Sequence, residues 1–375
     1  MKKIFLCVNY PIYNEAIGIS KKIRSQIDTF RNMGYEVSYS AYTEKGIAIY
    51  KNDLVDYEYN YPSRILLSFL RRFYLMQTCA KYIQHRKYDL GYIRWDAIDK
   101  PFINALSTLK NQCEHVMMDF HGYFPNIKAV GIKGHYIVFS TILNGYKLKK
   151  YVDLGLTETK NTELFGIKAL TIDTGIDINK YQPHKYCGNK DELHMISVAN
   201  ETVYHGYDRI INGLYNYYIQ TKSTSVHLHL VGKMSSKTIK LIRKLKIEQI
   251  VHLHGYKSGT DLVNIYNSCN IGIGPLAPHR VGGKEGTGIK TKEYFAIGLP
   301  YFYAGTELLV PNDYPYIFNV PADNSPIDIN SILSFYGSLK DDGRINSEMR
   351  KFAEIKYSWK TIFEQAIYIM NTDKK

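Results

Sequence analysis

The chain has 375 residues, of which 45% are hydrophobic, 14% aromatic and 22% charged. This composition is typical of a folded globular protein and excludes disordered, collagen-like and coiled-coil chains. The length is about twice that of one compact domain, so we expect two domains. The five cysteines are scattered and form no CxxC pair. This argues against a disulfide framework and a structural zinc site, and it fits a reducing compartment.

The net charge of +13 is concentrated in the first half of the chain. Residues 1–185 contain 26 lysines and arginines against 17 acids, and the remainder contains 22 against 18. Two segments, 63–87 and 120–152, contain basic residues and no acid. Such a surface attracts an anionic partner. Because no nucleic-acid-binding motif accompanies the charge, we expect that partner not to be nucleic acid.

Apolar runs decide the expected location. The run after Lys2 and Lys3 has five residues, too few for a signal peptide, and no run approaches the ~18 to 20 residues that cross a bilayer. Residues 63–87 combine apolar positions at helical spacing with basic residues. This pattern predicts an amphipathic helix that either lies on an anionic membrane or packs its apolar stripe on the first sheet. We expect a cytoplasmic protein, soluble or peripheral at the inner face of the membrane.

The first half of the chain shows alternating strand and helix patterns. Residues 18–33 have apolar side chains at helical spacing, and Gly34 closes that helix. Strand-like apolar runs are found at 2–9, 36–41, 89–94, 115–119, 153–157 and 169–172. Alternating strands and helices form a parallel sheet with right-handed crossovers, which predicts a Rossmann-like domain.

A second series follows the polar, proline-containing stretch 177–192. Its strand-like runs are 193–199, 226–231, 250–254, 270–274 and 301–303. We therefore predict two Rossmann-like domains, 1–185 and 186–375, with a C-terminal helix able to pack back on the first. The cleft between such domains is a natural ligand site, since strand carboxyl ends and helix N-termini face it.

The most informative stretch is 284–300, with the sequence KEGTGIKTKEYFAIGLP. Glu285 and Glu293 lie eight residues apart, and a Gly-x-Gly loop between them opens a helix that ends at a Gly-Leu-Pro turn. The free backbone N–H groups at the start of a helix attract phosphate. The two carboxylates can accept hydrogen bonds from hydroxyls of one extended ligand, such as a nucleotide sugar.

This stretch resembles the Glu-x7-Glu motif and Gly-Leu-Pro turn of the retaining glycosyltransferases of family 4. Further matching features are Gly18, the Thr-Gly-Ile-Asp of 174–177, the Val-Ala-Asn of 198–200, Gly255 and Trp359. The resemblance implies an α/β protein of the GT-B fold, with two Rossmann-like domains facing a central cleft. It also implies retaining hexosyl transfer from a nucleotide diphosphate sugar to a saccharide acceptor.

The resemblance also implies roles for individual residues. Glu285 would contact hydroxyls of the donor sugar, and Glu293 those of the ribose. The backbone of Gly286, Thr287, Gly288 and Ile289 would bind the sugar and diphosphate. His121 would lie near the transferred sugar, and Gly18 would lie in the first loop of the donor cleft.

The chain departs from the family at two positions. Asn200 and His205 stand where an arginine and, five residues later, a lysine usually neutralise the diphosphate. A neutral histidine still donates one hydrogen bond. We expect the missing positive charge from Lys290, Lys233 or Arg280, each placed on a loop facing the cleft, with Lys290 as first choice. Segments 205–209 and 289–294 also resemble bacterial transferases for surface polysaccharides such as capsule or exopolysaccharide. A lipid-linked glycan acceptor and an anionic membrane surface are therefore the expected partners.

Two His-Leu-His strands, at 227–229 and 252–254, suggest a metal site if they are neighbours, because alternate residues share a face. No acid or cysteine in the sequence completes a known ligand pattern around them. The resemblance implies a diphosphate bound without a structural metal, so we predict no metal and no other cofactor. His254 and Tyr256 are expected to border the nucleotide base.

Alternatives remain at this stage. The altered positions 200 and 205 fit a non-catalytic glycosyltransferase-like subunit, and a GT-B sugar-nucleotide epimerase would use the same fold and donor without an acceptor. Lys290 can be read as a surface lysine, His121 as a turn residue, His205 as a helix-start residue and Gly18 as a turn closure. The sequence does not name the sugar, the base, the acceptor, the linkage or the oligomeric state.

Overall fold

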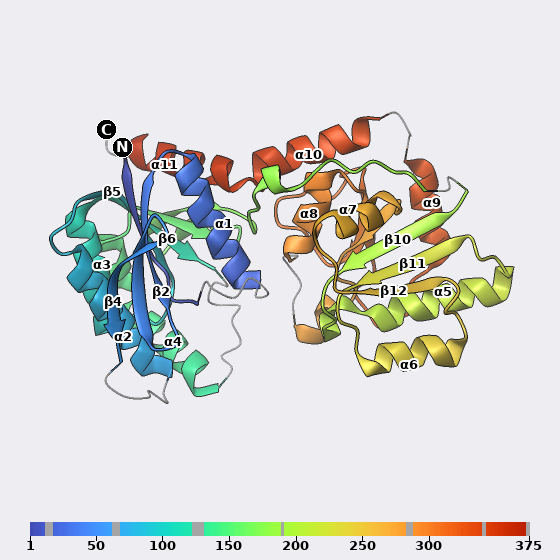
Figure 1. Cartoon of the computed structure of the whole chain (residues 1–375), viewed down its shortest axis with the longest axis horizontal. Helices are drawn as coiled ribbons and strands as arrows, with labels where there is room; N and C mark the ends of the chain where they lie inside the picture. The colour runs from blue at the N-terminus through green and yellow to red at the C-terminus, as the bar shows by residue number, and fades with distance from the viewer. Residues whose placement is uncertain are drawn as a thin grey trace. The chain divides into compact units, whose positions relative to one another are not determined.

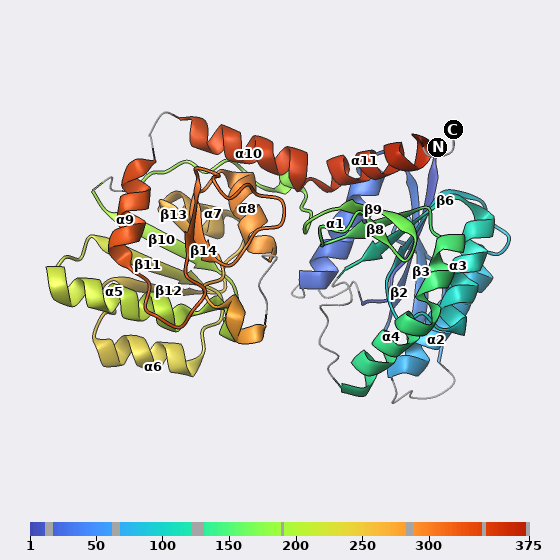
Figure 2. The same cartoon turned by 180° about the vertical axis from the view of Figure 1, so that it is seen from behind.

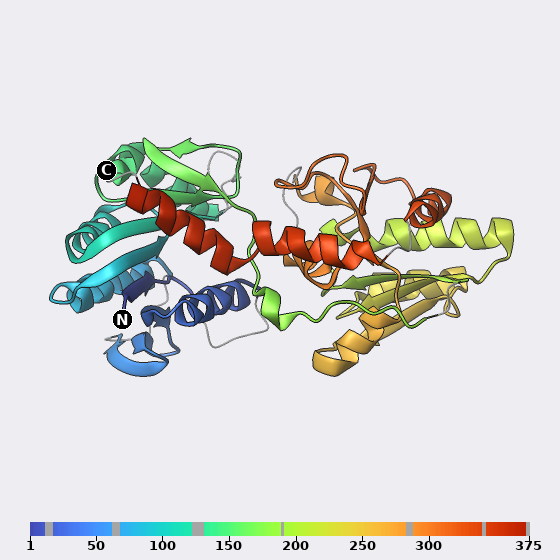
Figure 3. The same cartoon turned by 90° about the horizontal axis from the view of Figure 1, so that it is seen from above.

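The computed structural model describes residues 1–11, 18–61, 68–121, 131–188, 191–282, 288–339 and 343–372. The chain divides into two compact units (Figures 1 to 3). The first consists of Met1–Asp177 with Trp359–Lys375, and the second of Ile178–Ser358. The chain thus leaves the first unit eight residues before the domain boundary that we predict at 185/186, and its last helix belongs to the first unit.

The first unit is built on one sheet, which has nine strands in the described residues in the order β4-β3-β2-β1-β5-β6-β7-β9-β8. The strands are β1 (Lys3–Cys7), β2 (Glu36–Tyr42), β3 (Gly46–Lys51), β4 (Leu54–Asn60), β5 (Tyr88–Arg94), β6 (Cys113–Phe120), β7 (Leu154–Thr157), β8 (Glu163–Leu164) and β9 (Ile167–Thr171). The central strands from β2 to β9 pair in parallel, whereas β3, β4 and β8 pair antiparallel at the edges.

Helices cover both faces of this sheet (Figure 1). They are α1 (Gly18–Asn32), α2 (Ser68–Ile83), α3 (Lys100–Gln112), α4 (Gly131–Asn144), the 3-10 helix η1 (Gly145–Lys150) and α11 (Trp359–Thr372). Along β1, Phe5 and Cys7 pack with α2 and α3, while Ile4 and Leu6 pack with α1 and α11. Because both faces are buried, β1 reads as a continuous apolar run rather than an alternating one.

Trp359 opens α11 and lies fully buried in the first unit. A Cβ atom at Gly175 would lie 2.5 Å from the Trp359 indole, so no larger residue fits there without displacing the ring. Further along α11, the ring of Phe363 stacks on Phe30 of α1 with centroids 4.1 Å apart. The Gly175 and Trp359 positions of the sequence pattern therefore share one packing contact.

The second unit has a six-stranded, all-parallel sheet in its described residues, in the order β12-β11-β10-β13-β14-β15. The strands are β10 (Leu193–Val198), β11 (Val226–Val231), β12 (Val251–Gly255), β13 (Ile271–Ile273), β14 (Tyr301–Ala304) and β15 (Ile317–Val320). The helices are η2 (Ile178–Lys180), η3 (Val203–His205), α5 (Tyr207–Thr221), α6 (Ser236–Leu245), α7 (Gly259–Asn267), η4 (Pro278–Val281), α8 (Ile289–Ile297), α9 (Ile329–Ser338) and α10 (Arg344–Lys356). Counted from β10, the strand order is the 3-2-1-4-5-6 of a Rossmann fold.

The strand orders locate a candidate site in each unit. In a doubly wound sheet, ligands bind outside the carboxyl ends of the strands, where the order reverses. That point lies between β10 and β13 in the second unit and between β1 and β5 in the first. Both points carry residues whose side chains can bind a ligand or take part in a reaction.

The prediction of an α/β protein with two Rossmann-like domains is confirmed, and each predicted strand has an observed counterpart. That the two domains face a cleft stays a prediction. The hairpin of β3 and β4 and the strands β8 and β15 were not predicted. Among the described residues, no helix is both long enough and apolar enough to span a membrane.

Candidate functional site

The switch point of the second unit is bordered by two loops that bond to each other. One loop follows β10 and contains η3, and the other follows β13. The backbone N–H of Leu276 donates to the carbonyl of His205 at 3.2 Å, and that of Ala277 donates to Tyr204 at 2.9 Å. Gly206 has φ +64°, and a Cβ there would lie 2.9 Å from Ala277. The two loops therefore form one rigid edge at the end of the sheet.

Asn200 holds the carboxyl end of β10 to the neighbouring loop. Its Oδ1 accepts the backbone N–H of Lys233 at 2.9 Å, and Glu201 N–H donates to the Lys233 carbonyl at the same distance. Gly232 has φ +120°, and a Cβ there would lie 2.3 Å from the carbonyl oxygen of Ala199. The Asn200 side chain thus binds backbone, and the Lys233 side chain is exposed.

Helix α8 begins beside this edge. Gly288 is its N-cap, and a Cβ there would lie 3.2 Å from the Tyr204 hydroxyl. Ile289 and the following residues form the first turn, whose backbone N–H groups have no intrahelical acceptor. The helix ends at Gly298 with φ +76°, where a Cβ would lie 2.4 Å from Asn346 Cα. The Gly-Leu-Pro turn therefore lets α8 pack closely on α10.

Lys290 was expected on a loop facing the cleft, but it is a helical residue. It lies in the first turn of α8 with only 5% of its surface exposed, and its Nζ donates to Ser197 Oγ at 3.0 Å. Burial lowers the pKa of Lys290 to about 7, against a smaller opposing effect of Glu293. Ser197 is at β10 and its Oγ lies 2.9 Å from the Tyr207 hydroxyl. The lysine ammonium is therefore held by the neutral hydroxyl group of Ser197, which itself contacts Tyr207.

His205 is a neutral donor beside this lysine. Its Nδ1 accepts the backbone N–H of Thr202 at 2.9 Å, which leaves the ring proton on Nε2. Burial, together with the charge of Lys290, lowers the pKa of His205 to about 3. His205 as a whole residue is 4% exposed, and its ring stacks on that of Tyr207. The histidine thus supplies a hydrogen bond but no charge.

Glu293 lies in the second turn of α8. The Glu293 Oε1 accepts the hydroxyl proton of Tyr181 at 2.7 Å, which orients the carboxylate from the segment after η2.

Arg280, another proposed cation, lies in η4 and makes two hydrogen bonds, of 2.7 and 2.8 Å, to the carboxylate of Asp208. Because this bidentate pair balances its charge, Arg280 is a poor substitute for the family's cationic clamp.

Several predicted site residues fall elsewhere. Glu285, Gly286 and Thr287 lie outside the described residues. Gly18 is the first residue of α1. Tyr256 follows β12 and is 78% exposed. A cavity of about 500 Å³ opens beside the η3 loop. Its lining includes Thr202, Val203, Gly206, Asp208, Ser235 and Arg280.

The switch point of the first unit holds a second cavity, of about 330 Å³. Its lining includes Asn9, Arg71, Arg72, Arg94, Trp95 and His121. His121 directly follows β6, and its ring centroid lies 6.4 Å from that of Trp95. Burial and the charge of Arg94 lower the pKa of His121 to about 4, so the ring is neutral at physiological pH. The geometry places a neutral histidine in a cavity rich in arginine.

A charged network that sequence reasoning missed lies behind His121. Asp119 is 1% exposed, and its Oδ2 accepts the Tyr92 hydroxyl proton at 2.7 Å. Although burial acts to raise it, Lys22, His121 and Arg94 together lower the pKa of Asp119 to about 2. No sequence pattern marks this network, because Tyr92 and Asp119 lie within β5 and β6, which are buried along nearly their whole length like ordinary core strands.

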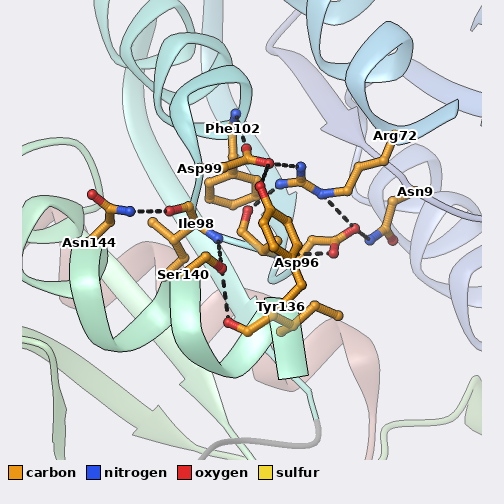
Figure 4. Close-up of polar contacts among 11 residues, drawn as sticks. Asn9, Arg72, Asp96, Ile98, Asp99, Phe102, Tyr136, Ser140 and Asn144 are labelled. Carbon is orange, nitrogen blue, oxygen red and sulfur yellow. Dashed lines mark hydrogen bonds and ion pairs between the residues drawn. The ribbon is translucent and has the colours of Figure 1, made fainter. Parts of the chain in front are cut away.

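Arg72 belongs to the basic segment 63–87, for which we predict a charged surface, but it is buried and does not contribute to that surface. Its guanidinium lies 3.2 Å from Asp96 Oδ2 and 2.5 Å from Asp99 Oδ2, and it donates to the carbonyl of Ala97 (Figure 4). Asp99 Oδ2 also accepts the Tyr136 hydroxyl proton of α4 at 3.0 Å. The arginine therefore joins α2, the loop after β5 and α4. The apolar stripe of α2 packs in the core, while Arg71 and Lys81 remain exposed.

The family model of glycosyl transferases group 1 matches residues 195–305. This range contains the switch point of the second unit. No curated protein matches the chain in sequence.

Solved structures match the chain over nearly its whole length. A glycosyltransferase of Rickettsia africae has a TM-score of 0.70 at 15% identity, covering 100% of this chain and 99% of that one. HepE of Anabaena, solved with UDP, has a TM-score of 0.62 at 13% identity, covering 99% and 100%. The lipopolysaccharide outer core galactosyltransferase WaaB has 0.57 at 16%, covering 98% and 99%. The chain has the GT-B fold. Together with the match at 195–305, this fold supports a glycosyltransferase.

Proposed function

We propose that the protein is a retaining glycosyltransferase that moves a sugar from a nucleoside diphosphate donor to a saccharide acceptor. The observation that carries the proposal is the group of Lys290, His205 and the α8 N-terminus at the switch point of the second unit. This group lies within the residues that match the glycosyltransferase family model. The Lys290 cation, the neutral donor His205 and the positive end of the α8 helix dipole are together suited to a diphosphate.

Lys290 replaces the missing charge clamp in this proposal. Among the described residues it has no carboxylate ion-pair partner, and its ammonium is held by Ser197 alone. Burial lowers its pKa to about 7, so it can gain a proton near neutral pH. An approaching diphosphate favours the charged form and draws a proton onto it. As the leaving diphosphate gains charge during transfer, this preorganised cation and the helix N-terminus stabilise it.

Donor hydroxyls are assigned to the two glutamates of the motif. In this proposal Glu293, whose carboxylate is oriented by Tyr181, accepts hydrogen bonds from the ribose hydroxyls. Glu285 is assigned to the donor sugar, as the family resemblance implies. HepE was solved with UDP-glucose, at a TM-score of 0.59 to this chain. We infer a donor of the same class, without assigning its base or sugar.

The cavity of the first unit is assigned to the acceptor side of the reaction. His121 is neutral there and can donate or accept a hydrogen bond to a sugar hydroxyl. Arg71 lines the cavity and is exposed, so it adds positive charge to the opening. This charge favours an acceptor that carries phosphate, as a lipid-linked bacterial glycan does.

Helix α4 supports an acceptor presented at a membrane. Its side chains Ile132, Phe139, Ile142 and Leu143 are all more than half exposed, at 92, 61, 62 and 52%. The following η1 adds the exposed lysines 147, 149 and 150. An apolar helix face flanked by lysines is suited to the surface of an anionic bilayer. We therefore place the enzyme at such a surface, in synthesis of a bacterial cell-surface polysaccharide.

Release of nucleoside diphosphate from a panel of UDP- and GDP-sugars tests the proposal. We expect the wild type to consume one donor and Glu285→Gln to lower the rate by at least ~100-fold, or ~2.7 kcal/mol in the barrier. Glu364→Gln on α11 is the control, because this exposed glutamate pairs only weakly with Lys360, at 3.9 Å. Absence of any donor turnover would favour a non-catalytic subunit. Turnover to an epimer without acceptor would favour an epimerase.

A further inference from the structure

Five histidines gather on one face of the sheet in the second unit, where β10, β11 and β12 lie side by side (Figure 1). In the register, His194 of β10 is opposite His227 of β11, and His229 of β11 is opposite His252 of β12. His254 follows two residues along β12. Since alternate residues of a strand share a face, all five rings lie on the same side. The opposite face carries core residues such as Leu228.

The rings are connected by hydrogen bonds in two rows. In one row, His194 Nδ1 lies 2.9 Å from His229 Nε2, and His229 Nδ1 lies 3.0 Å from His254 Nε2. In the other, His227 Nδ1 lies 3.1 Å from His252 Nε2. Each contact therefore joins an Nδ1 to an Nε2. The first ring of each row is His194 in one and His227 in the other. The Nε2 of each of these rings takes no part in the contacts of its row.

Glu192 brings a carboxylate to that end. Its Oε2 lies 3.0 Å from His194 Nε2 and 3.8 Å from His227 Nε2. One ligand atom from each of the three residues lies within 4.8 Å of the others. The side chains of Glu192, His194 and His227 are 35, 16 and 15% exposed, so the group is reachable from solvent. Glu192 could not be recognised as a ligand from the sequence, because it precedes β10. Only the pairing of β10 with β11 brings it close to His227 as well as His194.

We propose that Glu192, His194 and His227 form a binding site for a divalent transition-metal ion, with Zn²⁺ as the best fit. Zn²⁺ binds imidazole nitrogen and carboxylate oxygen at about 2.0 to 2.2 Å, so tetrahedral ligand atoms are separated by about 3.3 Å. The observed 3.0 and 3.8 Å bracket that separation. Small side-chain movements would therefore complete the site, and water would fill the fourth position.

The remaining histidines supply the outer contacts of such a site. A histidine that binds metal through Nε2 carries its proton on Nδ1 and donates it to a neighbouring acceptor, which fixes the ring. Here the Nδ1 of His194 faces His229 Nε2, and the Nδ1 of His227 faces His252 Nε2. The proton order continues without conflict to His254. Both rows are thus arranged to orient the two metal-binding rings.

The metal would fasten the segment that enters β10 to the neighbouring β11. Glu192 belongs to that segment, and His227 belongs to the strand beside β10. Because the bound ion favours the folded state, Zn²⁺ should raise the melting temperature by mass action. This site involves neither Lys290 nor His121, so it is independent of the proposed transferase reaction.

Calorimetric titration of Zn²⁺ into the full chain, with any purification tag removed, tests the proposal. We expect one Zn²⁺ per chain, no binding of Mg²⁺, and a higher melting temperature with Zn²⁺. His227→Gln should weaken Zn²⁺ binding by at least ~100-fold, and the outer His229→Gln by ~10 to 100-fold. His85→Gln, an exposed histidine after α2, is the matched control and should bind as the wild type does.

Absence of Zn²⁺ binding by the wild type would overturn the site, as would equal binding by His227→Gln. Glu192→Gln provides a second variant on the segment before β10, where a change does not disturb strand pairing. It should also weaken Zn²⁺ binding. Circular dichroism of each variant without metal establishes that the fold is intact, so that a loss of binding reports the ligand and not unfolding.

Discussion

Replacing Lys290 with methionine should stabilise the folded protein while weakening its binding of nucleoside diphosphate. Methionine keeps the length of the side chain and removes the buried charge. Burial lowers the pKa of Lys290 from its ordinary value of 10.5 to about 7. This difference corresponds to a cost of about 5 kcal/mol for holding the protonated lysine in the folded state below pH 7. The lost bond to Ser197 offsets about 1 to 3 kcal/mol of the gain.

The pH dependence follows from the direction of the shift. Below pH 7 both folded and unfolded chains hold the proton, and the full cost applies to the wild type. Between the two pKa values only the unfolded chain holds it, so the wild type gains about 1.4 kcal/mol of stability for each pH unit. The advantage of Lys290→Met in free energy of unfolding should therefore shrink by about 2 kcal/mol between pH 7 and pH 9.

Urea unfolding at the two pH values measures this effect, and calorimetry with UDP and GDP measures the binding. We expect Lys290→Met to lose about 1.5 to 3 kcal/mol of affinity, or about 10 to 150-fold, as for a hydrogen bond to a charged group. Lys240→Met, an exposed lysine on α6, is the control for both assays. A difference between Lys290→Met and wild type that is the same at pH 7 and pH 9 would refute the argument from the buried ammonium.

Three further outcomes are expected. Gly175→Ala should lower the free energy of unfolding by about 1 to 3 kcal/mol, measured by urea titration, because its methyl group would overlap the Trp359 ring. Arg72→Met should lower the free energy of unfolding by about 3 to 5 kcal/mol in the same assay, since it leaves the carboxylates of Asp96 and Asp99 without their arginine partner. In sedimentation with vesicles, the protein should bind anionic but not zwitterionic lipid, less so at high salt, and Arg71→Gln with Lys81→Gln should reduce that binding. Equal binding to both lipids would contradict the membrane assignment.

The sequence was sufficient for the parallel strands, because a strand buried on both faces is a continuous apolar run. It did not predict the hairpin of β3 and β4. There, Leu54 and Val55 of β4 are exposed and the alternating residues are mostly polar or tyrosine, so the pattern resembles a loop. Edge strands lack the strong apolar signal of central ones, since one side of their backbone meets solvent.

For the candidate site, the family resemblance predicts roles for Glu293, Lys290 and His205, but it does not predict their surroundings. Lys290 was expected on a loop facing the cleft, because lysine is rarely buried, whereas it lies in the first turn of α8 with its ammonium bonded to Ser197 of β10. Arg72 was counted with the surface charges for the same reason. Its partner Asp99 lies 27 positions away in sequence, and no local pattern connects the two.

The place of α11 in the first unit has a consequence for biogenesis. Trp359 and Phe363 fill the core between α1 and the sheet, yet they are synthesised only after the whole second unit. At about 5 to 20 residues per second, the roughly 180 residues of the second unit separate that moment from synthesis of the first sheet by about 10 to 40 seconds. During this interval Phe30 and its neighbours lack their cover, while the second unit is continuous in sequence and can complete its own core. The first unit therefore begins synthesis before the second but completes its core after it. A chain truncated before Trp359 would expose an apolar surface to chaperones and proteases.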